Sequence, residues 1–150
     1  MIENILLQKV RELKAKGIVQ WENSEVLWRT LAKDYFPENF YFVYNQQELI
    51  GLFCVVDFDP HYWPNDTAHR ALYIHKVVVL DKACGTGASS FILDEFKRLG
   101  KIAKMRSVKL DVRAHKNKLR AYYERNGFVL VRIEDLDFGY DTALYEFVLS

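Results

Sequence analysis

The residues best suited to chemistry form a small-residue turn between a β-branched run and a helical pattern. Residues 77–79 are all valine, residues 85–90 read GTGASS, and apolar residues then recur at helical spacing. The first turn of a helix has backbone N–H groups without intrahelical partners, and the helix dipole favours negative charge there. Small side chains let this backbone approach a ligand closely. The turn therefore predicts a site for a phosphate-bearing ligand.

Two other interpretations of the turn stay open at this point. Glycines at positions 85 and 87 also occur in ordinary tight turns that bind nothing. The turn is not a P-loop, because the Lys-Ser/Thr pair that follows the last glycine of that motif is missing. A phosphate- or nucleotide-binding module of another kind is one function that such a turn can serve.

His75 lies on the predicted strand that leads into the turn. An imidazole, with a reference pKa of about 6.5, suits a general base, although a histidine on an apolar strand can equally be a packed core residue. Asp57, Asp59 and His61 are more distant candidates for the base. The histidines and aspartates of residues 57–69 match no recognised pattern of metal ligands, so no metal is expected.

Composition limits the class of protein. A chain of 150 residues, half of them apolar, is ample for one domain over residues 1–150 and short for two. A net charge of +1 gives no argument for nucleic acid or for a membrane partner. No apolar run spans a bilayer, and Glu3, Lys9 and Arg11 interrupt any signal peptide. Cys54 and Cys84 form no disulfide or metal motif, so we expect a soluble cytoplasmic protein.

The elements that position these residues alternate between helix and strand. Hydrophobic spacing predicts helices at 2–16, 24–36, 90–103 and 116–126, a loop at 59–69, and strands at 40–44, 49–58, 72–79, 108–112, 128–133 and 143–149. A hairpin connection makes antiparallel neighbours, whereas the two helical crossovers are expected to make parallel ones. The order therefore predicts an α/β fold with a mixed sheet.

Residues 72–131 resemble the core of the GNAT family of N-acetyltransferases, which bind acetyl-coenzyme A. Three blocks carry the resemblance: YIHKVVV at residues 73–79, CGTGAS at 84–89 and YYERNGF at 122–128. In the family the middle block reads R/Q-x-x-G-x-G/A, and the third is similar to its Y-E-x-x-G-F junction. The resemblance implies a GNAT-like acyl-CoA N-acyltransferase fold, with a mixed, mainly antiparallel central sheet flanked by helices.

The middle block can be aligned in two registers. One places Lys82, Gly85 and Gly87 on the motif, and its basic residue fits. The other places Cys84, Gly87 and Ser89 on it, and keeps the family's spacing both to residues 77–79 and to Asp111. We prefer the second register, in which Cys84 replaces the usual Arg or Gln and Ser89 the final Gly or Ala.

The resemblance implies a role for each part of the site. The backbone of Val77 and Val79 would pair with the pantetheine arm, and an N–H of Val77 or Val78 would polarise the thioester oxygen. Tyr123 matches the tyrosine that faces the coenzyme sulfur, where a phenol can protonate the departing thiolate. Asn117 lies one position past the family's asparagine. The implied cofactor-binding residues are Val77, Val78, Val79, Cys84, Gly85, Thr86, Gly87, Ala88, Ser89, Ser90, Asn117 and Tyr123.

The acceptor side departs from the family. Several members have a glutamate at the position of Tyr73, and no carboxylate replaces it locally. His75, two residues further on the same strand face, is therefore the first candidate for the base, with Tyr123 as the acid. Trp21 and Trp63 lie in predicted connections, where they would either line the pocket for the acceptor or cap the core from outside.

The function favoured by the resemblance is transfer of an acetyl group from acetyl-coenzyme A to a primary amine on a small molecule or peptide. The alternative is a coenzyme A-binding regulatory or interaction domain that has lost catalysis, since the motif positions of Tyr73 and Cys84 are degenerate. Members of the family often dimerise, so the resemblance is also compatible with a homodimer. The sequence carries no code for the identity of the amine.

Overall fold

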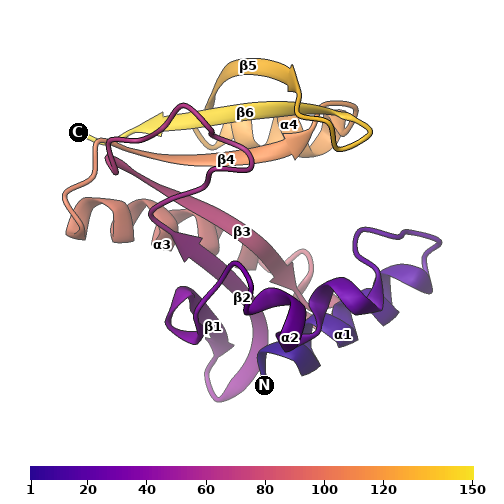
Figure 1. The fold of residues 1–150 in the computed structure, drawn as a ribbon. Helices are drawn as coiled ribbons and strands as arrows, with labels where there is room; N and C mark the ends of the chain where they lie inside the picture. Colours follow the sequence, from indigo (N-terminus) through magenta and orange to yellow (C-terminus); the bar gives the residue numbers. More distant parts are fainter. The chain divides into compact units, whose positions relative to one another are not determined.

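The computed structural model describes residues 1–150 and contains one six-stranded sheet, in the order β1-β2-β3-β4-β6-β5 (Figure 1). The strands are β1 Phe40–Asn45, β2 Glu48–Val56, β3 Ala71–Val79, β4 Ser107–Arg113, β5 Val129–Asp135 and β6 Asp141–Val148. The α-helices are α1 Ile2–Lys14, α2 Trp28–Leu31, α3 Ala88–Ile102 and α4 Asn117–Arg125. Three short 3₁₀ turns lie at Asn23–Val26, Pro37–Asn39 and Asp81–Ala83. The expected α/β class is confirmed.

The sheet is mixed and mostly antiparallel, as expected. β1 and β2 pair antiparallel, and so do β4 with β6 and β5 with β6. The crossover through α3 places β3 parallel to β4, with three paired positions from Ala71↔Ser107 to Tyr73↔Lys109. The second crossover, through α4, makes β5 run in the same direction as β4, since both are antiparallel to β6. The expectation that they would be neighbours was wrong, because β6 lies between them. This order buries Ala143, Leu144 and Tyr145 on both sides of β6.

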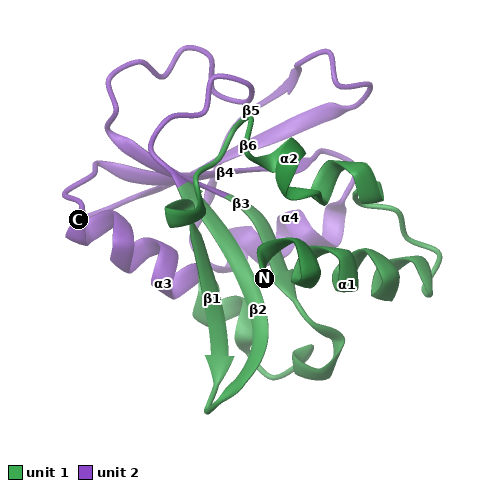
Figure 2. Ribbon diagram, turned by 60° about the horizontal axis from the view of Figure 1, so that its bottom comes forward, with its two compact units in different colours: residues 1–55, 75–92 green, residues 56–74, 93–150 purple.

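The chain divides into two compact units, coloured separately in Figure 2. Unit 1 consists of Met1–Val55 and His75–Ile92, and unit 2 of Val56–Ile74 and Leu93–Ser150. β3 and α3 each begin in one unit and end in the other. The single domain over residues 1–150 stays a prediction.

In unit 1, α1 buries Ile5, Leu6 and Val10 and ends in a turn at Gly17, whose φ is +76°. The expected helix over residues 24–36 was largely wrong, because only Trp28–Leu31 is α-helical. Leu27 is extended, and the backbone N–H of Trp28 donates to Glu3 Oε1 at 2.9 Å. The carboxylate of α1 therefore caps α2 at this point, which fixes a later helix start than the local sequence favours.

In unit 2, a core cluster of Trp63, Ala71, Tyr73 and Leu144 joins the loop after β2 to β3 and β6. The loop at 59–69 has neither helix nor strand, as predicted. On α4, Glu124 accepts a hydrogen bond from the Tyr145 hydroxyl. None of the helices combines the length and the apolar character needed to cross a membrane.

Candidate active site

The predicted phosphate turn lies in unit 1, between the 3₁₀ turn Asp81–Ala83 and α3. Residues 84–87 are exposed, and Gly85 and Gly87 have φ values of +80° and +87°. Side chains other than glycine rarely adopt this backbone conformation. The carbonyl of Gly87 accepts the N–H of Phe91 at 3.0 Å, so helical hydrogen bonding begins at the end of the glycine turn. The opening turn of α3 carries only the small side chains of Ala88, Ser89 and Ser90, which suits the approach of an anion.

Contacts from α1 hold the entry to this turn. The backbone N–H of Asp81 donates to Glu12 Oε1 at 3.0 Å, and Lys16 Nζ lies 2.7 Å from Asp81 Oδ1. The hydrogen bond from Lys16 lowers the pKa of Asp81 below its ordinary value. Within the turn, the hydroxyl and the N–H of Thr86 both donate to the carbonyl of Ala83. The glycine turn is therefore held from its N-terminal side by packed side chains, while its outer face stays open.

The start of α3 bears on the two registers of the glycine motif. With Cys84, Gly87 and Ser89 on the motif, its first glycine comes directly before α3 and the last position falls in the first helical turn. With Lys82 on the motif, the basic residue lies in the 3₁₀ turn, and its Nζ is 3.8 Å from Glu48 Oε1. The start of α3 supports the register that places Cys84, Gly87 and Ser89 on the motif. This register stays a prediction.

β3 carries a backbone irregularity directly before the three valines expected to bind the coenzyme, at residues 77–79. Lys76 has a φ of +53°, which is uncommon for a residue with a side chain and costs of the order of 1–3 kcal/mol. Its ammonium lies 5.2 Å from the centre of the Trp21 ring. The irregularity lies directly before Val77, whose N–H is one of the two expected to face the thioester. Further along, the carbonyl of Val79 accepts a hydrogen bond from Lys9 Nζ at 2.7 Å.

His75 directly precedes this irregular residue. Its side chain is half-buried in unit 1, and the centre of its ring lies 6.1 Å from that of Tyr35. Because the imidazole is neither fully enclosed nor fully solvated, its position suits proton transfer as well as packing. The role of His75 as a base stays a prediction.

Tyr123 lies on α4 of unit 2, between the rings of Tyr122 and Phe128 at 5.9 and 6.1 Å. Burial, with smaller contributions from Asp111 and Tyr122, raises the pKa of Tyr123 to about 12. The phenol therefore keeps its proton at neutral pH, as a general acid must. Asn117, the other coenzyme residue expected here, is exposed at the start of α4, where its N–H donates to the carbonyl of His115 at 2.9 Å.

Tyr73 stands where several family members have a glutamate, and the structure gives it another role. Its side chain is 2% exposed and its hydroxyl donates to Asp66 Oδ2 at 2.6 Å. The same oxygen accepts a hydrogen bond from Lys109 Nζ at 2.6 Å. Burial and the contact with Asp66 raise the pKa of Tyr73 above its ordinary value. Tyr73 therefore holds the loop after β2 against the sheet and is unsuited to accept a proton.

The two tryptophans expected near the acceptor differ in their surroundings. Trp63 is 2% exposed and packs in the core cluster of unit 2, with Lys109 Nζ 4.5 Å from the centre of its ring. Trp63 therefore packs within the core of unit 2, and its place in the acceptor pocket stays a prediction. Trp21 is half-buried in unit 1, and its place in the acceptor pocket stays a prediction.

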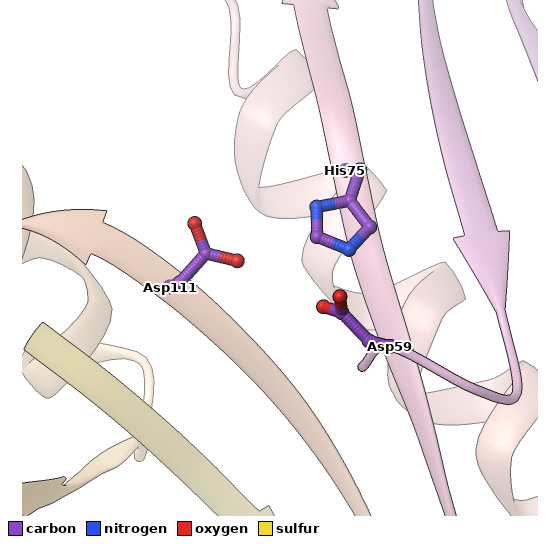
Figure 3. Close-up of side chains that lie close together, drawn as sticks. All are labelled: Asp59, His75 and Asp111. Carbon is purple, nitrogen blue, oxygen red and sulfur yellow. The ribbon is translucent and has the colours of Figure 1, made fainter. Parts of the chain in front are cut away.

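A pair of carboxylates in unit 2 was only partly foreseen. Asp59 follows β2 and is 5% exposed, and Asp111 lies on β4; a carboxylate oxygen of each lies within 4.8 Å of the other. Figure 3 draws these two side chains, together with His75 of unit 1. Asp111 was not a predicted site residue, although its alternation with Lys109 places both on one face of β4. The other carboxylate and imidazole candidates, Asp57 and His61, are both exposed.

The sequence matches the model of one protein family. Residues 7–128 match the model of the acetyltransferase (GNAT) family, which is more than half of the chain. No curated protein sequence matches. The chain therefore belongs to the GNAT family of acetyltransferases.

Solved structures with the same fold come from distant sequences. A GNAT-family acetyltransferase from Listeria monocytogenes matches with a TM-score of 0.79 and 20% identity, covering 99% of this chain and 87% of that one. Ard1 from Thermoplasma volcanium matches with a TM-score of 0.70 and 16% identity over 100% and 95% of the two chains. A putative streptothricin acetyltransferase from Bacillus anthracis, in complex with acetyl coenzyme A, matches with a TM-score of 0.61 and 16% identity over 74% and 62%. At these identities the likeness establishes the fold alone.

Proposed function

We propose that this protein transfers an acetyl group from acetyl-coenzyme A to a primary amine. The observation that carries the proposal is the exposed glycine turn at the start of α3, with positive φ at Gly85 and Gly87, directly after β3. This is where the family resemblance expects the coenzyme's pyrophosphate. That the related Bacillus anthracis protein binds acetyl coenzyme A supports the same choice of donor.

The cofactor would be held mainly by backbone groups. N–H groups of the glycine turn and of the first turn of α3 would donate to the pyrophosphate, where the helix dipole favours its charge. The exposed thiol of Cys84 in place of the family's Arg or Gln leaves these main-chain donors intact. Residues 77–79 of β3 would pair with the pantetheine arm, and the N–H of Val77, after the irregular Lys76, would polarise the thioester carbonyl.

Aminolysis requires a neutral amine and a protonated leaving group. An alkylammonium has a reference pKa of about 10.4, so the acceptor must lose a proton before it attacks. His75 would accept that proton, and the neutral amine would then attack so that the new C–N bond forms as the C–S bond breaks. The thiolate would take a proton from Tyr123, and the second proton of the attacking nitrogen would pass through solvent to return the Tyr123 phenolate to its acid form. Holding amine and thioester together would supply much of the rate, because a bound pair reacts without the entropy loss of a collision.

The acceptor is a primary amine of unassigned identity. Trp21, with Lys76 over its ring, is the aromatic side chain we propose for the acceptor pocket. An aromatic wall would favour amines with an apolar or aromatic body. The soluble, cytoplasmic character expected from the sequence is part of the same proposal.

The first test measures release of free thiol from acetyl-coenzyme A in the presence of a panel of primary amines. We expect release that depends on both the protein and an amine, and thermal stabilisation by coenzyme A but not by ATP. Stabilisation by coenzyme A without turnover on any amine would favour the alternative, a coenzyme-binding domain that has lost catalysis. Stabilisation by ATP alone would exclude both coenzyme functions in favour of a nucleotide-binding module.

A second prediction concerns the base. His75→Ala should lower kcat/KM at pH 7 by about a hundredfold, the lower end of what a general base contributes, and added imidazole should restore part of it. A general base also makes the rate fall when the pH is lowered. We expect this fall in the wild-type enzyme and not in His75→Ala. Asp111→Asn is the comparison variant in unit 2. If it abolishes turnover while His75→Ala leaves the rate and its fall at low pH unchanged, the base is the carboxylate and our assignment is wrong.

A further inference from the structure

A lysine of α1 reaches the end of β3, within unit 1. Lys9 Nζ lies 2.7 Å from the carbonyl oxygen of Val79 and 3.4 Å from Asp81 Oδ1. The same ammonium lies 3.8 Å from Glu12 Oε1. Because the side chain of Lys9 is only 13% exposed, water screens these contacts little, and the positive charge strengthens the hydrogen bond to the carbonyl. Lys9 therefore joins α1 to the strand end that leads into the glycine turn.

The carbonyl that Lys9 contacts lies on the open edge of β3. The N–H of Leu80 donates to the carbonyl of Ile50 on β2 at 2.9 Å. Since the backbone groups of successive strand residues point to opposite edges, those of Val79 point away from β2. On that other edge, β4 pairs with β3 only over residues 71–73. Lys9 thus holds a backbone group on the edge where the pantetheine arm is proposed to pair, directly before the phosphate turn.

The side chain of Cys84 starts toward the same carbonyl. Its Sγ lies 3.9 Å from the oxygen of Val79 and 3.7 Å from that of Leu80. In the register that we prefer, Cys84 stands where the family motif has Arg or Gln, whose side chains carry strong N–H donors. A thiol is a weak donor, so Cys84 alone holds these carbonyls poorly. The strong, cationic donor at the end of β3 comes instead from Lys9, 70 residues before Val79 in the chain.

We infer that Lys9 takes the place of the motif's absent Arg or Gln and positions the end of β3 and the phosphate turn for the coenzyme. This role of Lys9 rests on the proposed function and on the register that begins at Cys84. Through Val79 and Asp81, Lys9 fixes the backbone directly before the turn. A backbone that is already fixed loses less entropy when the coenzyme binds, so the affinity is higher. Lys9 is a positioning residue, because it acts through the backbone of Val79 and not on the reacting atoms.

Lys9→Met keeps the apolar stem of the side chain and removes its ammonium. Loss of this charge-assisted hydrogen bond should weaken coenzyme A binding about tenfold, measured by calorimetry, and should raise the KM for acetyl-coenzyme A more than it lowers kcat. Lys9→Arg restores the cation and should bind coenzyme A nearly as tightly as wild type. Lys14→Met, the same change at an exposed position of α1, should leave the affinity unchanged. Thermal unfolding without coenzyme checks that each variant is folded, and Lys9→Gln gives the same comparison if Lys9→Met is not.

Cys84→Gln tests the replacement itself. It returns a residue of the family motif to position 84 without adding a charge beside the pyrophosphate. If Lys9 replaces that residue, Cys84→Gln should recover most of the affinity that Lys9→Met loses, and its gain should be smaller in the wild-type background. An equal change in both backgrounds, or wild-type affinity in Lys9→Met, would overturn this role of Lys9 while the proposed function stands. If the wild-type protein binds no coenzyme A, the proposed function fails and this role of Lys9 fails with it.

Discussion

Tyr123→Phe should lower kcat by about a hundredfold to ten-thousandfold, while the affinity for coenzyme A barely changes. The substitution removes only the hydroxyl and keeps the ring that packs beside Tyr122 and Phe128. The coenzyme thiolate must then leave without a proton from the protein. The measurement is steady-state turnover with the best amine of the panel, together with coenzyme binding by calorimetry.

The pH dependence adds an independent check. Because burial raises the pKa of Tyr123 to about 12, the acid form persists throughout the usable range. Because its pKa is raised, the Tyr123 hydroxyl loses its proton only at a pH above the ordinary value near 10. We therefore expect no fall in kcat from ionisation of this phenol below about pH 11.

Tyr122→Phe is the matched control, since it removes a hydroxyl from the neighbouring ring of the same helix. It should leave kcat close to the wild-type value. An equal loss of turnover and coenzyme affinity in Tyr123→Phe would mean that the residue contacts the coenzyme or supports the fold. Equal effects of the two variants would remove Tyr123 from the reaction as an acid.

The sequence predicted those elements whose signal is local. The apolar spacing of α1 and α3 and the alternation in β4 follow from each segment's own burial, and the structure has them close to the expected bounds. The helix expected from Ser24 failed because its start is set by Glu3, 25 residues before Trp28 in the chain. The sequence also did not predict that β6 lies between β4 and β5. The length of a connection does not specify beside which strand the returning strand pairs.

In the candidate site, too, features with a local sequence signal could be predicted and features set by distant residues could not. The glycine turn could be recognised because glycine itself signals positive φ, whereas Lys76 gives no such signal and yet has a φ of +53°. The hydrogen bond from Tyr73 to Asp66 explains why a buried phenol occupies a position where a base was expected. The proximity of Asp59 and Asp111 depends on the path of a loop without regular structure, which no periodicity describes. Long-range contacts, rather than local pattern, decide these features.

Gly87→Glu should weaken coenzyme A binding by about a hundredfold or more. The substitution puts a side chain on the outer face of the turn, where nothing lies within 4 Å of a Cβ, so the space meant for the ligand is filled. It also adds a negative charge beside the expected pyrophosphate and strains a backbone with φ +87°. Loss of two charge-assisted hydrogen bonds alone would cost about 3–6 kcal/mol, which is more than a hundredfold in affinity.

A matched control separates the ligand from the strain. Gly139 has φ +85°, with nothing within 4 Å of a Cβ, and lies in the turn between β5 and β6. Gly139→Glu therefore carries the same backbone penalty and the same charge at a position without an expected ligand. Both variants should lose similar thermal stability without coenzyme, but only Gly87→Glu should lose stabilisation by coenzyme A.

The outcome also decides between the two registers of the glycine motif. Both registers include Gly87, so Lys82→Ala is the variant that distinguishes them. If Cys84 heads the motif, Lys82→Ala removes only a weak surface pair with Glu48 and coenzyme affinity should change little. A large loss in Lys82→Ala would place the basic residue on the pyrophosphate and move the motif toward the 3₁₀ turn. Unchanged binding in Gly87→Glu would exclude the turn as the phosphate site in either register, because no anion could share its surface with the new carboxylate.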